Sequence, residues 1–516
     1  MARVAKKTAT VARKSATPRM TAPETGASGE LKPVALMVSP RIPGFLVRGR
    51  FDAAGMDAQS RRNWMGADTL SADAALSPTI RHRIAVRARY ETANNGYLDG
   101  IVNTLASDVV GTGPRLQLSF NDGKDDGGRL DRREQRFAKW AKQARLTAKL
   151  KLARRSRVID GEVFFLKFRD TKLSGPFKTN IRLYEAEQIA SSTVDSAIQD
   201  THKDGEPIEV DGIFYDADGN PTSYRFLKVH PGSNLAGIGE SIIHRAENVI
   251  HYANIERPGQ HRGVSEIAST LTVYNDLRRY RAAVVGAAEV AADLPFLLHT
   301  TTPPTDENGD SVQQHLDPGT IIEFSRNSGM SLPEGWQVTQ LKPEQPTENY
   351  SEFVRTQIRE AARSLSMPLN VALGDSSQYN YASGRLDHQT YFRRISEDRN
   401  EIETVILNVL LGDFEEADRL FYPEDYAEGE EVLVEWMWDG FAHVDPAKEA
   451  SALLTRLESG TTSLALECAK EGRDWKAVTI QRAKEKEFAR RLGVLPADES
   501  GAGDSARESE EDGAER

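Results

Sequence analysis

The sequence has little cysteine and no long apolar run. Its 516 residues contain one cysteine, Cys468, which excludes an internal disulfide framework and a cluster of thiolate metal ligands. The longest nearly apolar stretch, residues 282–292, contains Glu289 and is too short to cross a bilayer. No basic and then apolar secretory leader opens the chain. We therefore expect a protein that folds in a reducing, aqueous compartment and has no membrane partner.

The motifs of common enzyme classes are also missing. The sequence has no Walker phosphate loop, no Gly-x-Ser-x-Gly nucleophile elbow and no His-Glu-x-x-His helix. The Gly-x-Gly at residues 111–113 is not a dinucleotide fingerprint, because Leu116 stands at the third glycine position and Pro114 interrupts the turn. The ten histidines are scattered along the chain. We predict no catalytic residue, no metal site and no cofactor.

The composition that is present is that of a large globular protein. Hydrophobic residues make up 39% and charged residues 28%, and a chain of this length predicts about two to four domains. The net charge is -11. Residues 1–20 hold six Lys and Arg without an acid, and residues 498–516 hold eight acids and two arginines. The charges of these two tails therefore cancel, and we expect both tails to be disordered. The acidic part of the chain between the tails disfavours tight binding of nucleic acid, but it is compatible with DNA that slides past the protein.

Periodicity and turn residues predict both helices and strands in the first half. Residues 58–110 are predicted to be helical with a break at residues 94–96, and the turn at 111–114 leads into a strand. A helix at 130–146 precedes a β-rich region, in which residues 218–221 form the turn of a hairpin. The predicted strands of that region are residues 163–168, 181–184, 212–215, 224–229 and 249–252.

Long helices dominate the second half. Residues 264–292 predict one helix whose second half consists of small residues, which suit close packing against neighbouring helices. A turn-rich segment, residues 294–346, contains a strand candidate at 320–324. A second helix follows with Thr347 as its N-cap, and Met367-Pro368 ends it.

A polar loop, residues 374–381, leads into a third long helix over residues 382–411. Its apolar stripe, which includes Ile395 and Ile402, is predicted to lie opposite a polar face that includes Asp398. Three shorter helices follow. The first opens at Asp445-Pro446, and the three end at Gly460, Gly472 and Gly493.

Short segments along the chain occur in an order that is typical of one family. They are Asn-Asn-Gly-Tyr at 94–97, Val-Val-Gly-Thr-Gly at 109–113, Asp-Gly-Glu at 160–162, Glu-Ala-Glu-Gln-Ile at 185–189, His-Pro-Gly at 230–232, Asn-Val-Ile-His at 248–251, Arg-Pro-Gly-Gln at 257–260, Arg-Gly-Val-Ser at 262–265, Leu-Gly-Asp-Ser-Ser at 373–377, Asn-Tyr-Ala-Ser at 380–383, Asp-Pro-Ala-Lys-Glu at 445–449 and Gly-Arg-Asp-Trp at 472–475. In this order they resemble the portal proteins of tailed phages, specifically the lambda-type family. The resemblance covers residues 60–490, and the long polar head is a departure from it.

The resemblance implies a mixed α+β, portal-like protomer. The implied parts are a flexible basic N-terminal arm at 1–57, a β-rich wing at 58–263 and 382–444, long stem helices at 264–293 and 347–367, a β-containing clip at 294–346, a tunnel loop at 368–381, a helical crown at 445–495 and an acidic disordered tail at 496–516.

The resemblance also implies a function and a set of partners. Copies of the chain would form a ring, a dodecamer in the virion, around a channel for double-stranded DNA at one capsid vertex. The implied partners are the terminase large subunit, a head-completion or adaptor protein, and the major capsid and scaffold proteins. The implied location is the virion, and the host cytoplasm during assembly. The alternatives are another phage head–tail structural protein, or a phage-encoded nuclease or protease.

Three of these parts contain the candidate site residues. Side chains of the tunnel loop that would touch passing phosphates weakly are Ser376, Ser377, Gln378, Tyr379, Asn380 and Tyr381; the alternative is an ordinary polar surface loop. Stem residues that would face the channel or a neighbouring subunit are Arg278, Arg279, Arg281 and Glu289, with salt bridges between subunits favoured for the arginines. Candidate residues for terminase docking in the clip are Asp306, Glu307, Asn308 and Asp310.

Overall fold

The computed structural model divides the chain into two units, residues 1–68 and 69–516. The described residues are 62–120, 128–189, 208–234, 240–293, 296–300, 336–340, 349–377, 381–427, 429–440, 446–473 and 475–494. Of the first unit only 62–68 are described, and residues 62–66 form a helical turn. Among the described helices, none combines the length and the apolar composition that a membrane span requires.

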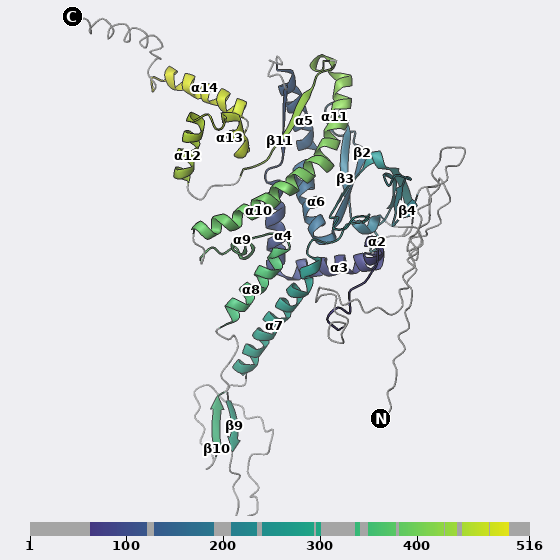
Figure 1. The fold of residues 1–516 in the computed structure, drawn as a ribbon, viewed down its shortest axis with the longest axis vertical. Coiled ribbons are helices and arrows are strands. Elements are labelled where there is room, and N and C mark those ends of the chain that lie inside the picture. The colour runs from purple at the N-terminus through teal and green to yellow at the C-terminus, as the bar shows by residue number, and fades with distance from the viewer. Residues whose placement is uncertain are drawn as a thin grey trace, which may run out of the picture. The chain divides into compact units, whose positions relative to one another are not determined.

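The second unit begins with helices that meet at the predicted break (Figure 1). After the short α2 (Ala72–Ala75), α3 (Pro78–Asn94) is followed at once by α4 (Gly96–Val110). Asn95 caps α4, because its side-chain oxygen accepts a hydrogen bond from the backbone N–H of Tyr97 at 3.2 Å. The turn after α4 places Gly111 and Gly113 at φ of 56° and 107° and leads into β1 (Arg115–Phe120). The predicted break, turn and strand are confirmed.

The next segment differs from its prediction. The structure has two helices, α5 (Arg129–Gln143) and α6 (Leu146–Asp160), where the sequence predicted one helix at 130–146. Arg145 takes the left-handed conformation, with φ of 54°, and separates them. The second helix was missed because the arginines Arg154 and Arg157 are buried beside its apolar side chains, so its pattern does not read as an amphipathic stripe.

Two antiparallel sheets form the β-rich region (Figure 1). In the first, β2 (Glu162–Arg169) lies between β3 (Thr179–Tyr184) and β8 (Val249–Ala253). The second has the order β4 (Ile208–Val210), β5 (Ile213–Tyr215), β6 (Pro221–Leu227) and β7 (Ser241–Arg245). The predicted hairpin is the β5–β6 pair. The sequence did not predict β4 and β7, which are short edge strands.

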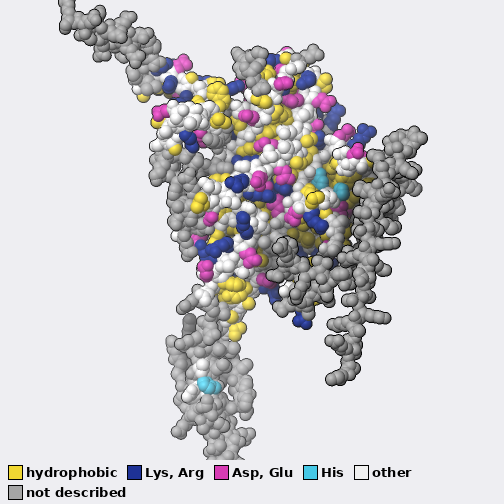
Figure 2. Space-filling model, in the orientation of Figure 1, with side chains coloured by type: hydrophobic (Ala, Val, Ile, Leu, Met, Phe, Trp, Pro, Cys, Tyr) yellow, Lys and Arg dark blue, Asp and Glu magenta, His cyan; other side chains and the backbone are white. Residues whose placement is uncertain are grey.

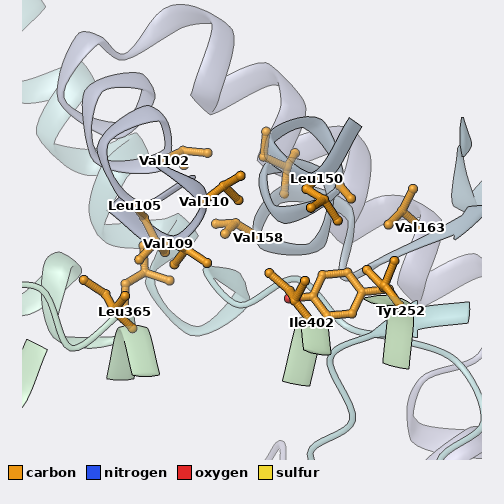
Figure 3. Packing of buried hydrophobic residues seen from close by; sticks show 14 of the residues in the cluster. Val102, Leu105, Val109, Val110, Leu150, Val158, Val163, Tyr252, Leu365 and Ile402 are labelled. Carbon is orange, nitrogen blue, oxygen red and sulfur yellow. The ribbon is translucent and has the colours of Figure 1, made fainter. Parts of the chain in front are cut away.

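A large apolar core joins the helices to the first sheet. Figure 3 shows the ring of Tyr252 of β8 beside Ile402 at the end of α10 (Tyr381–Ile402), and Val109 of α4, Val158 of α6 and Val163 of β2 belong to the same cluster. A second cluster, which includes Phe164, Ile189, Tyr224 and Phe226, lies between the two sheets. The predicted apolar residues of the third long helix, Ile395 and Ile402, are buried in the large core.

The long helix α7 (Leu271–Asp293) begins later than the predicted residue 264, after a 3-10 turn at Ala268–Thr270. Residues 263–265, which have no regular secondary structure, pack against the backbone at the start of β2. A Cβ at Gly263 would overlap the carbonyl oxygen of Gly161, and Ser265 donates its hydroxyl to the carbonyl of Val158 at 2.9 Å. This backbone contact, which sequence periodicity does not reveal, moves the helix start.

The remaining long helices also shift their ends. The helix α8 (Tyr350–Arg363) has Asn349 at its N-cap position, and the predicted N-cap, Thr347, lies outside the described residues. The short α9 (Leu369–Leu373) follows Pro368. A π-helical turn, Glu403–Leu407, joins α10 to α11 (Asn408–Phe421), so the helical run extends past the predicted residue 411.

Short strands and helices complete the described chain. An antiparallel pair, β9 (Phe296–Thr300) and β10 (Trp336–Gln340), flanks residues 301–335, which lie outside the described residues together with the strand candidate at 320–324. The strand β11 (Val432–Met437) pairs with β1. The predicted C-terminal helices are confirmed as α12 (Pro446–Glu458), α13 (Leu464–Lys470) and α14 (Trp475–Arg491). The chain is therefore a mixed α+β protein.

Candidate assembly surface and polar loop

The helices α7 and α8 pack against each other as a pair (Figure 1). Aromatic side chains hold them together. The ring of Tyr280 on α7 lies 5.9 Å from the ring of Tyr350 and 4.9 Å from the ring of Phe353, both on α8. Such pairs add about 0.5–1.5 kcal/mol each beyond the area they bury. The two helices thus form a defined hairpin-like pair within one chain.

The second half of α7 is apolar but largely uncovered. Val284 is buried, whereas Val285 and Val290 are 57% and 58% exposed. Ala282 and Ala283 are exposed as well. Hydrophobic side chains are visible on the surface over this helix pair in Figure 2. An apolar helix face that a single chain leaves exposed is typical of a protein–protein contact.

The three arginines of α7 differ in what they contact. The guanidinium of Arg278 lies 2.8 Å from a carboxylate oxygen of Glu91 on α3 in the same chain. Arg281 lies over the ring of Tyr97 on α4, 5.3 Å from its centroid. Arg279 is exposed, and its guanidinium lies 3.9 Å from a carboxylate oxygen of Asp276 on the same helix. The ion pair that the structure gives Arg278 is thus within one chain; a contact of these arginines, or of the exposed Glu289, with another subunit stays a prediction.

The polar loop after α9 has a well-defined beginning. Gly374 takes the left-handed conformation that ends α9. The next residue, Asp375, donates its backbone N–H to the carbonyl of Asn370 at 3.1 Å, and one oxygen of its carboxylate accepts the N–H of Ser377 at 2.9 Å. The other oxygen lies 3.4 Å from the guanidinium of Arg355 on α8. Hydrogen bonds from Ser377 and the nearby Arg355 hold the pKa of Asp375 below its usual value.

The structure describes only part of the predicted site residues. Ser376 and Ser377 are exposed at the start of the loop, and Tyr381 is the first residue of α10. The other three loop residues, Gln378, Tyr379 and Asn380, lie outside the described residues. The same holds for the four candidate docking residues Asp306, Glu307, Asn308 and Asp310. For all of these the predicted roles stay predictions.

A buried ion cluster joins α6, the segment before α7, and α10. The side chain of Arg154 is fully buried and lies 2.9 Å from a carboxylate oxygen of Glu266 and 2.7 Å from one of Asp398. Burial disfavours the charged form of Glu266, but Arg154 and Arg157 outweigh it and lower the pKa of Glu266. The prediction that Asp398 lies on a polar face opposite the apolar stripe is wrong, because Asp398 is buried with its partner Arg154.

A second buried cluster gathers several of the short motifs. Glu162 at the start of β2 is fully buried and lies 2.7 Å from the guanidinium of Arg262 and 2.8 Å from Nε2 of His251. Arg262 also donates to the backbone carbonyls of Ala186 and Ile189. Although burial opposes it, Arg262 holds the pKa of Glu162 well below its usual range. These motif residues stabilise a junction between strands, and their sequence separation of about a hundred residues hid this role.

One group of described residues has the composition of a metal site. Oxygen and nitrogen atoms of Glu185, Glu187 and His230 lie within 4.8 Å of one another. The guanidinium of Arg89, however, lies 2.7 Å from Glu187 and 3.3 Å from Glu185. The backbone N–H of Gly232 donates to Nδ1 of His230 at 3.0 Å, which leaves the proton on Nε2, the atom that faces Glu185. The group is therefore an ion cluster around Arg89.

Comparisons with known proteins agree with the motif order. The model of the family described as phage portal protein, lambda family, matches residues 58–399. A probable portal protein of Halomonas phage phiHAP-1 is 24% identical over 437 residues, which cover 79% of this chain and 80% of the relative. The match therefore extends over most of both proteins.

Two solved structures are also similar to the chain. A chain of the virion of a native gene transfer agent particle is 15% identical with a TM-score of 0.39, and covers 75% of this chain and 92% of its own length. A chain from the neck of a native gene transfer agent particle, computed with C12 symmetry, is 15% identical with a TM-score of 0.40. This match covers 77% of our chain and 94% of the neck chain. TM-scores this low do not establish a shared fold. The family match, which runs from the helices before β1 into α10, does establish the family: this chain belongs to the lambda family of phage portal proteins.

Proposed function

We propose that copies of this chain form a closed ring, expected to be a dodecamer, at one vertex of the capsid and around a channel for double-stranded DNA. The single observation that carries the proposal is the exposed apolar half of α7, with Val285 and Val290 both more than half exposed. A closed ring needs two different surface patches that repeat around an axis. In such a ring α7 would pack against the helix pair of the next copy, which covers the exposed face. Family membership supports the same assembly.

We assign the parts of the protomer as the resemblance implies. Residues 58–263 and 382–444 would be the wing, 264–293 and 347–367 the stem, 294–346 the clip, 368–381 the tunnel loop and 445–495 the crown. The pairing of α7 with α8 supports the stem assignment, and the pair β9–β10, which lies between them in sequence, supports a β-containing clip. The basic arm and the acidic tail would flank this body.

The charge of the chain fits a channel through which DNA slides. The net charge of -11 makes a deep attractive well for the phosphate backbone unfavourable, because tight binding needs clustered Lys and Arg. Hydroxyl and amide side chains of the loop at 376–381 would touch phosphates weakly.

The protein itself would hydrolyse nothing. ATP turnover would belong to the terminase, which would dock on residues 294–346 during assembly in the host cytoplasm, before head-completion proteins take its place in the virion.

Electron microscopy of the purified full chain tests the ring. We expect closed rings with an open centre, and a mass by light scattering close to twelve copies. A chain that stays monomeric at micromolar concentration in low and high salt, without rings, would reject the proposal. Deletion of residues 301–335 separates the clip assignment from the ring, since we expect rings to persist and terminase binding to be lost.

A further inference from the structure

The carboxylate of Asp375 connects the polar loop to a helix of the stem pair. One oxygen accepts the backbone N–H of Ser377 at 2.9 Å, which fixes the first turn of the loop. The second oxygen lies 3.4 Å from Nη1 of Arg355, in the second turn of α8. A single carboxylate therefore receives one contact from the loop and one from α8.

The side chain of Arg355 is directed toward the loop. It is only 13% exposed, whereas Arg359, about one turn further along the same helix, is exposed. An arginine that is mostly covered and faces a carboxylate is poorly placed to meet a passing phosphate. Its geometry is that of a residue that holds another residue in position.

The far side of the loop is held separately. The amide nitrogen of Asn370 on α9 lies 3.1 Å from Nε2 of His388 on α10, the helix into which the loop leads. The two ends of the loop are thus held by contacts with different helices. Asp375 is tied to α8 through Arg355, and α10 is tied to α9 through His388.

We propose that Arg355 is a positioning residue that makes the start of the polar loop, at Ser376 and Ser377, follow the position of α8. The ion pair is partly exposed, since the side chain of Asp375 is 45% exposed, so it contributes little to stability. The pair instead sets the orientation of the Asp375 carboxylate. With the pair in place the carboxylate presents its other oxygen to Ser377; without it, the Asp375 side chain rotates and the turn loosens. A shift of α8 would then move Ser376 and Ser377.

The test uses a spin label at Ser376→Cys in the full chain, with Cys468→Ser as background. Arg355→Gln removes the cation, and Asp375→Asn removes the charge but keeps a side-chain oxygen for the N–H of Ser377. We expect each to raise the ratio of mobile to immobile label about two- to fivefold, the range that a partly exposed ion pair supports. Arg355→Lys should restore part of the immobile population. The double variant should match the single variants, because both remove the same contact.

Arg359→Gln is the matched control, with an exposed arginine removed from the same helix. A label ratio in Arg355→Gln no different from that of Arg359→Gln overturns the inference, as do single effects that add in the double variant. Thermal melting distinguishes this positioning role from a role of Arg355 in stability alone. A role in stability alone would lower the melting temperature of Arg355→Gln without changing the label ratio. The contact lies within one chain, so the label reports it whether or not rings form.

The importance of this contact for DNA rests on the proposed function. In assembled particles we expect Arg355→Gln to form normal rings and to retain less packaged DNA than Arg359→Gln. Absence of rings in the unmodified chain counts against the proposed function and leaves the label experiment in force. Normal rings with an unchanged label ratio count against the role of Arg355 alone.

Discussion

Replacement of Arg154 with methionine removes the cation from a cluster that the structure buries completely. The guanidinium is fully buried and donates to Glu266 at 2.9 and 3.0 Å and to Asp398 at 2.7 and 3.1 Å. Both carboxylates are themselves buried. Removing one partner of a buried pair costs about 3–5 kcal/mol, because the other charge stays behind without compensation. Arg157 and Arg394 remain 3.2–3.7 Å from the same two carboxylates, so we expect the lower end, about 3 kcal/mol.

Urea denaturation of the full chain, at one protein concentration, measures this loss. Arg155→Met is the matched control. Arg155 is next in sequence, pairs at the surface with Asp99 at 2.9 Å, and is 31% exposed, so its loss should cost at most about 1 kcal/mol. Replacing Glu266 and Asp398 with Gln and Asn in the Arg154→Met background should recover part of the stability, since no buried charge is then unpaired. If Arg154→Met and Arg155→Met destabilise equally, the cluster does not have the energetic role that its burial indicates.

Three further predictions follow from other parts of the molecule. Gly263→Ala should destabilise the chain by several kcal/mol in urea denaturation, because its Cβ would overlap the backbone of Gly161, whereas Gly286→Ala, with open space around it, should not. Val285→Glu should yield monomers in light scattering at micromolar concentration with an unchanged circular dichroism spectrum; rings that persist would show that this face of α7 is not the contact. Glu162 has a folded pKa below its ordinary value of 4.5, so its contribution to the unfolding free energy should be complete above about pH 4.5 and be lost as pH falls further, and Glu162→Gln should flatten that dependence.

The elements that the sequence predicted correctly are those whose signals are local. Asn95 caps α4 through its own side chain, and Gly460, Gly472 and Gly493 take the left-handed conformation that ends a helix. The hairpin of β5 and β6 depends on the five residues 216–220 that connect the two strands. In each case the residues that determine the structure are neighbours in the sequence, so a single sequence contains the information.

The errors arise where the local structure depends on a residue that is distant in the sequence. The face of Asp398 on α10 depends on Arg154, which is 244 residues away. The start of α7 depends on Gly161, whose backbone packs against Gly263. The contact between Arg355 and Asp375 spans twenty residues and crosses from α8 to the loop. Residue type and periodicity predicted a polar loop in this place, but they did not indicate which side chain holds it.

The contacts of Arg154 have a consequence for how the parts of the protomer move. Glu266, one of its partners, precedes α7, and the backbone N–H of Glu266 also donates to the carbonyl of Val158 at 3.1 Å. Asp398, the other partner, lies on α10, the helix that the polar loop enters. One buried guanidinium therefore links the segment before α7 to α10. Because breaking this link costs about 3 kcal/mol, α10 and the start of α7 should move as one body, so Ser376 and Ser377, which Arg355 positions, should shift with α8 relative to α10.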